Sequence, residues 1–185
     1  MSSLRIEIEE TPNPETLKFL LNIQVLKGMG AASFSDFEEA KNSPMAQHIL
    51  HIDGVKSVFL ASNFISVTKK EEFEWDMLST NIQAAIMDHI SAGYPIMIEE
   101  YVADYPNGLK TELEKQISDV IDLKIRPAVQ ADGGDIEMCG FEDGVVFVRM
   151  QGACSGCPQS LFTLKAGIER TLKHFVPEVV SVEQV

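Results

Sequence analysis

The chain has 185 residues, of which 45% are hydrophobic, and its 15 basic and 28 acidic side chains give a net charge of −13. This length is sufficient for two small domains with a core each, while the acidic balance argues against nucleic acid as a partner, because nucleic-acid binding depends on a basic surface. The sequence shows neither an apolar run of about eighteen residues nor a signal-peptide pattern, so we expect no membrane partner and a cytoplasmic protein; a mature mitochondrial protein without its transit peptide would look the same.

The first half predicts short strands and helices in alternation. Alternating apolar and polar residues are typical of a half-buried strand, and Ser35 with Glu38 matches a capping box, where a short helix should begin. Ser43-Pro44 begins another helix, which Asp53-Gly54 ends. The expected strands are residues 4–9 and 17–23, as an antiparallel pair, and 55–60 and 64–68, as a hairpin; an amphipathic helix is expected over 73–91.

A domain boundary is expected near residue 100. The stretch 99–108 is acidic and ends in Pro-Asn-Gly, as linkers between compact units often do. We therefore predict a first domain at 1–100, a linker at 101–108 and a second domain at 109–185.

The second half predicts the order helix, strand, strand, helix, strand. An apolar stripe runs through 109–129, although Pro127 should kink or stop the last turn of that helix. Asp132-Gly133-Gly134-Asp135 reads as a tight turn rather than a cation site, since such a turn needs glycine and tolerates aspartate. Asp143-Gly144 predicts a hairpin. The remaining expected elements are strands to residue 140, at 145–150 and at 179–185, and a helix over 158–174. Both domains thus belong to the α+β class.

The motif Cys154-Ser155-Gly156-Cys157-Pro158 lies between the second of these strands and the second helix. Unpaired backbone N–H groups and the helix dipole favour thiolates at a helix N-terminus, and thiolates bind metals. Structural zinc and iron–sulfur sites commonly take four protein ligands, so this pair supplies half of a set. The only other cysteine is Cys139, read as a small packing residue. A second copy of the motif, brought up by a two-fold axis, would complete the site.

Two other functions fit the same cysteine pair. A thiol–disulfide oxidoreductase also places Cys-x-x-Cys between a strand and a helix, but the 28 residues after Cys157 are too few to complete a thioredoxin-like fold. A zinc-bridged structural dimer is the other alternative. No nucleophile and general base are paired in the sequence, so we do not expect an enzyme. Arg126 would tune a cluster if it lay near the thiolates.

Three further stretches carry a resemblance to a known family. The C-terminal domain of NifU, the Nfu domain, is similar to residues 125–136 and 152–158, which read IRPAVQADGGDI and GACSGCP, and the N-terminal domain of Nfu proteins resembles residues 11–19, TPNPETLKF. The resemblance implies an iron–sulfur cluster scaffold or carrier. It implies a [4Fe-4S] cluster held by Cys154 and Cys157 of each of two subunits, in a homodimer or higher homo-oligomer. Its implied partners are upstream assembly proteins and the apo iron–sulfur proteins that receive the cluster.

Overall fold

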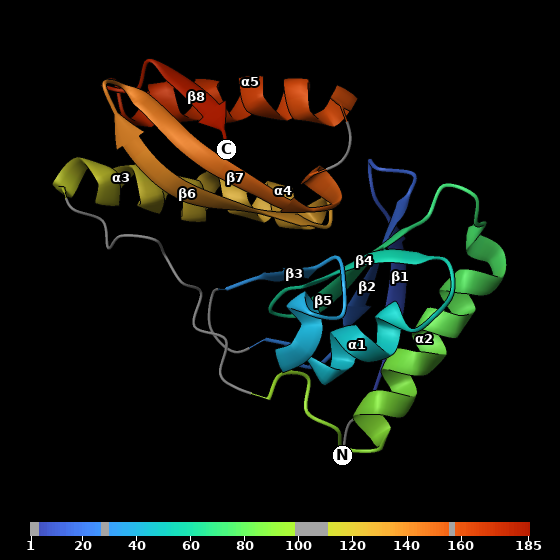
Figure 1. Cartoon of the computed structure of the whole chain (residues 1–185). Coiled ribbons are helices and arrows are strands. Elements are labelled where there is room, and N and C mark those ends of the chain that lie inside the picture. Colours follow the sequence, from blue (N-terminus) through green and yellow to red (C-terminus); the bar gives the residue numbers. More distant parts are fainter. Residues whose placement is uncertain (1–3, 27–29, 99–110, 156–157) are drawn as a thin grey trace. The chain divides into compact units, whose positions relative to one another are not determined.

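The computed structural model describes residues 4–26, 30–98, 111–155 and 158–185. The chain divides into two compact units, Met1–Ala103 and Asp104–Val185, and each contains both helices and strands (Figure 1). The expected α+β class is therefore confirmed. The predicted linker, 101–108, lies outside the described residues. Of the helices in the described ranges, none has the length and apolar content needed to cross a membrane.

The first unit contains a five-stranded antiparallel sheet. Its spatial order is β1-β2-β5-β4-β3, with the bounds Ile6–Glu10, Thr16–Leu21, Phe64–Lys69, Val55–Leu60 and Ala32–Phe34 for these strands in turn. The predicted pairing of the first two strands and the predicted hairpin of β4 with β5 are both confirmed. The edge strand β3 was not predicted, because three residues are too few to show a period of two.

Two helices and a 3₁₀ turn complete the first unit: η1 at Glu39–Asn42, α1 at Pro44–Leu50 and α2 at Trp75–Ser91. Ser43 caps α1 as predicted, since its hydroxyl accepts the Ala46 N–H at 3.2 Å. The capping box of Ser35 with Glu38 is wrong. Instead Asp36 accepts the Glu39 N–H at 2.9 Å, while the Glu39 carboxylate accepts the N–H and hydroxyl of Ser35 at 2.7 Å each. The side chains of Asp36 and Glu39 therefore cap this turn, each one residue after the predicted pair of Ser35 and Glu38.

The helices α1 and α2 pack on one face of this sheet and enclose its main core. Fully buried members include Phe19, Met45, Ile49, Leu60, Ile65, Ile82 and Ile86. A smaller cluster, made of Ala31, Phe59, Ala61 and Phe64, forms separately from it.

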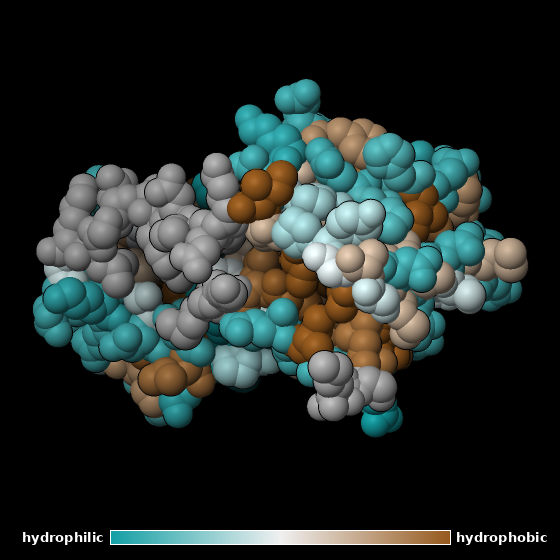
Figure 2. Space-filling model, turned by 90° about the horizontal axis from the view of Figure 1, so that it is seen from below, coloured by the Kyte–Doolittle hydropathy of each residue, from teal (hydrophilic) through white to brown (hydrophobic). Residues whose placement is uncertain are grey.

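Some large apolar side chains of the chain reach solvent, as the brown areas bordered by teal show in Figure 2. Single exposed apolar residues are normal on a folded protein, so they mark no site by themselves.

The described part of the second unit, from residue 111, begins with one continuous helical segment in three parts: α3 (Glu112–Val120), the π-helical turn η2 (Ile121–Ile125) and α4 (Arg126–Ala131). Thr111 caps α3 in a reciprocal capping box with Glu114. A stop or kink was expected at Pro127. The structure instead has a π-helical turn before Arg126, and the helix continues to Ala131. Pro127 has no N–H to donate, and the Arg126 N–H reaches back five residues to the Ile121 carbonyl.

The second unit also holds a three-stranded sheet in the order β6-β7-β8. Its strands are Gly134–Glu142, Val145–Gly152 and Ser181–Gln184. The predicted hairpin joins β6 to β7, whose register skips from Met138 to Gly140 and leaves Cys139 in a bulge. Because β8 pairs with β7 in parallel, a crossover is required, and α5 (Pro158–Phe175) provides it. The predicted order of helix, strand, strand, helix and strand is thus confirmed.

Helices cover the core face of this sheet. One cluster joins the strands to every helical part of the unit; its members include Ile117, Ile121, Val129, Ile136, Val146, Val148, Ile168, Leu172 and Val182. Cys154 belongs to the same cluster. The core thus reaches to the end of β7, where the cysteine motif begins.

Candidate metal centre

The cysteine motif begins where β7 ends. Gly152 closes the strand with φ +67, a left-handed conformation that favours glycine, and the 3₁₀ turn η3 (Ala153–Ser155) follows. Cys154 lies in this turn and is only 4% exposed. Cys157 lies outside the described residues, directly before Pro158, where α5 begins. One predicted ligand is thus placed at the junction of the sheet and the crossover helix.

Gly134 lies directly against the Cys154 thiol. A Cβ added at Gly134 would be 2.6 Å from Cys154 Sγ and 2.6 Å from the Gln151 carbonyl oxygen. Real Cβ atoms do not approach other atoms so closely, so no side chain fits at this position without displacing the thiol or the strand. The glycine therefore has a steric role, which is to leave room for the sulfur.

The turn that carries Gly134 is also bonded to the cysteine turn. The Ala153 N–H donates to the Gly133 carbonyl at 3.2 Å, and Gly134 is the register partner of Gly152 in the β6–β7 pair. The segment Asp132–Asp135, which we call the diglycine turn, hence contacts η3 in two ways: Gly133 accepts a hydrogen bond from it, and Gly134 packs against the Cys154 thiol. Sequence reasoning treated it as a turn and did not connect it with the cysteines.

An ion-pair network fixes the far end of the diglycine turn. Arg126 Nη1 donates to both carboxylate oxygens of Asp135 at 2.6 Å, while its Nε and Nη2 donate to Asp122 Oδ1 at 3.0 and 2.9 Å. Arg126 and Asp135 expose only 12% and 7% of their side chains. The structure therefore places the Arg126 guanidinium on two carboxylates. Asp122 was missed in the sequence, although its spacing of four residues from Arg126 on a helix is a recognisable ion-pair signal.

Burial changes the proton affinity of groups near this site. It raises the pKa of the Asp135 carboxyl, and the adjacent Arg126 guanidinium opposes that rise. Burial likewise raises the pKa of the Cys139 thiol, against the opposing effect of Arg149. Cys139 is therefore protonated more readily than an ordinary cysteine, which makes it a poorer metal ligand. Among the described residues no group of three or more His, Cys, Asp or Glu side chains could hold a metal ion.

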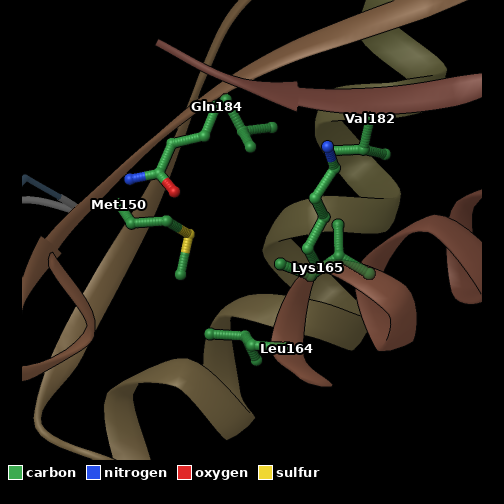
Figure 3. A pocket seen from close by; sticks show the side chains of 7 residues that line it. Met150, Leu164, Lys165, Val182 and Gln184 are labelled. Carbon is green, nitrogen blue, oxygen red and sulfur yellow. The ribbon is translucent and has the colours of Figure 1, made fainter. Parts of the chain in front are cut away.

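A small pocket opens between β7, β8 and α5 (Figure 3). Figure 3 shows Met150 and Leu164 bordering the space, while Lys165 and Gln184 add polar groups at its side. Its lining residues in the described part of the chain are Val148, Met150, Leu164, Lys165, Ile168, Val182 and Gln184. None of these is a cysteine, a histidine or a carboxylate, so the pocket and the candidate metal centre are different features.

Both units match models of known protein families. The family model "Scaffold protein Nfu/NifU N terminal" matches residues 6–93, and the model "NifU-like domain" matches residues 117–183. Together the two models cover most of both units.

Curated relatives match over nearly the whole chain. NifU-like proteins 4 and 5, mitochondrial, of Arabidopsis thaliana are 45% and 44% identical over 97% of this chain. A Drosophila ananassae protein named "NFU1 iron-sulfur cluster scaffold homolog, mitochondrial" is 41% identical, also over 97% of the chain. The chain spans 65%, 67% and 64% of the lengths of these three relatives.

The chain belongs to the Nfu/NifU family of iron–sulfur cluster scaffold proteins. The family resemblance expected from the residues is confirmed, with both of its domains present.

Proposed function

We propose that this protein holds a [4Fe-4S] cluster between two copies of the chain, through Cys154 and Cys157 of each copy, and delivers it to apo iron–sulfur proteins. The observation that carries the proposal is the placement of Cys154 in a turn at the end of β7, four residues along the chain before α5 begins, within a member of a scaffold family.

The donor set fits such a cargo. Cluster irons bind thiolates, and four cysteines are the common set for a [4Fe-4S] cluster. The chain has three cysteines in all, and the raised pKa of Cys139 disfavours the thiolate form that iron requires. Two copies of the pair formed by Cys154 and Cys157 supply four thiolates, which favours a homodimer as the loaded state.

Delivery is proposed because the cysteine pair lies in the chain between β7 and α5, outside the regular strands and helices. A turn at a helix N-terminus can present sulfurs to a second subunit and later to the thiolates of an acceptor, so the cluster can leave by ligand exchange. The protein is then a carrier rather than an enzyme, and it receives its cargo from upstream assembly proteins. The named relatives are mitochondrial proteins, so we propose a reducing compartment, either the cytosol or the mitochondrion.

Anaerobic reconstitution with iron and sulfide tests the proposal. We expect about four irons and four sulfides per dimer, and a dimer mass in solution that depends on both cysteines. Cys154→Ala and Cys157→Ala should each abolish loading, whereas the matched control Cys139→Ala should load like the parent chain. A cluster that never passes to an apo acceptor would contradict the delivery step. One zinc per dimer in place of iron and sulfide, or a monomer that cycles between dithiol and disulfide, would contradict the cluster itself.

We further propose that residues 1–100 and 109–185 act as separate domains joined by 101–108, and that the first domain selects partners. The two compact units support this division. Full-length chain and a chain beginning near residue 109 should load equally but transfer to acceptors with different selectivity. Equal transfer to every acceptor would remove the role given to the first domain.

A further inference from the structure

We propose that Asp122, Arg126 and Asp135 form a positioning network for Cys154, and that this network sets how long a cluster stays bound. The inference rests on the proposed function for its consequence in cluster binding, but its structural part concerns the apo chain alone. The three side chains come from η2, α4 and β6.

The first step is the strength of the network. Arg126 uses three nitrogens on two carboxylates, with four donor–acceptor distances between 2.6 and 3.0 Å. Nη1 contacts both oxygens of Asp135, while Nε and Nη2 share one oxygen of Asp122, so the planar guanidinium is held in one orientation, unlike the point charge of a lysine. Because Arg126 and Asp135 are both largely buried, solvent does not compete for these bonds.

The second step is the path from the network to the sulfur. Asp135 follows Gly134, whose backbone lies so close to Cys154 Sγ that no Cβ fits between them. The preceding residue, Gly133, accepts the Ala153 N–H. A shift of the diglycine turn would therefore move the Gly134 backbone that packs against the thiol and would also disturb the hydrogen bond from Ala153 to Gly133.

The third step is the origin of the network in the helix. Arg126 is the first residue of α4, and its N–H closes the π-helical turn on the Ile121 carbonyl. Asp122 lies within that π-helical turn. The irregular turn beside Pro127 thus has a consequence for the site, since it sets the place from which Arg126 reaches the sheet. π-helical turns are frequent at functional sites.

The test measures thiol reactivity at fixed pH, with cysteine alkylation read by mass spectrometry. A Cys157→Ser background makes Cys154 the only reactive thiol of its loop, and Cys139 in the same sheet serves as the internal reference. We expect Arg126→Gln to raise the ratio of Cys154 to Cys139 alkylation rates about tenfold or more, and Arg126→Lys to give an intermediate value. Lys173→Gln, which breaks the ion pair with Glu169 in α5, is the matched control and should leave the ratio unchanged.

The outcomes separate positioning from stability. Because Cys154 is buried and Cys139 is partly exposed, general loosening of the unit would also raise the ratio, but only by the factor that its loss of unfolding free energy allows. Denaturant unfolding of each variant gives that factor, and a rise in the ratio no larger than it would overturn the proposal. Asp122→Asn, which removes only one arm of the network, keeps the test valid if the Arg126 variants do not fold, and it should raise the ratio by a smaller factor.

Cluster release is the second readout, in the chain with both loop cysteines. Loss of iron to a chelator should accelerate in the same order, Arg126→Gln over Arg126→Lys over parent. If the parent binds no cluster, the proposed function fails while the alkylation ratio still decides the positioning role. Unchanged release alongside a raised ratio would overturn the link to cluster lifetime.

Discussion

Gly134→Ala places one methyl group where the structure has no room for it. The added Cβ would meet Cys154 Sγ and the Gln151 carbonyl oxygen, each at 2.6 Å, and Cys154 Cβ at 3.0 Å. One of these neighbours is backbone in the partner strand β7, which cannot rotate away. Either the thiol leaves its position or the end of the β6–β7 pair opens.

The magnitude follows from the cost of overpacking a filled interior. Extra carbon atoms in a well-packed site cost about 1–3 kcal/mol. For a domain of roughly this size, each 1 kcal/mol lowers the melting temperature by about 4–8 °C. We therefore expect Gly134→Ala to lower the transition of the second unit by several degrees and to weaken cluster loading more than its stability loss alone would.

Gly140→Ala is the matched control, because Gly140 lies in the same strand and a Cβ added there meets nothing within 4 Å. Calorimetry of the full chain would give the melting temperature of the second unit in each variant, and hydrogen exchange at the end of the β6–β7 pair would locate any opening. Loading with iron and sulfide completes the comparison. Identical transitions and identical loading in Gly134→Ala and Gly140→Ala would refute the steric reasoning.

Three further predictions concern other parts of the chain. Burial lowers the pKa of His89 below the ordinary 6.5, so its contribution to stability is present above pH 6.5 and is lost as pH falls through the lowered value. The free energy of unfolding should therefore fall more steeply between pH 7.5 and 5 in the parent than in His89→Gln, and equal slopes would contradict this. Thr111→Ala removes an exposed capping box and should cost about 1 kcal/mol in denaturant unfolding; no change would mean that α3 does not depend on its cap. Ser43→Ala should cost more, about 2 kcal/mol, because the buried Ser43 hydroxyl accepts from Ala46 and donates to the Ile96 carbonyl; a loss no larger than that of Thr111→Ala would count against this comparison.

The sequence was sufficient where a signal is local. Period-two alternation located β1, an apolar run located β2, the pair Asp143-Gly144 located the hairpin, and the missing N–H of Pro127 marked an irregular helix. The π-helical turn itself was not predictable, because its form depends on which carbonyl the Arg126 N–H reaches. The capping of η1 also shifted by one residue, because Glu39 rather than Glu38 accepts the Ser35 N–H and Asp36 accepts the Glu39 N–H.

The site needed the fold for its longer connections. The cysteine pair was visible as a motif, but Gly134 precedes Cys154 by twenty residues and meets it only because β6 and β7 pair in one register. The strand predicted up to residue 140 contains a bulge at Cys139 that was not predicted. Arg126 was noted in the sequence without a position, and only the structure pairs it with Asp122 and Asp135.

The parallel pairing of β8 with β7 has a consequence for the time at which the chain is made. The cysteine motif lies inside the crossover, so the ribosome releases Cys154 and Cys157 before Ser181, the first residue of β8. At ordinary elongation rates the 24 residues from Cys157 to Ser181 take roughly 1–5 s to synthesise. For that interval Cys154, which is buried in the complete unit, belongs to a core that still lacks β8. The nascent chain thus depends on a reducing environment to protect the Cys154 thiol until β8 is synthesised.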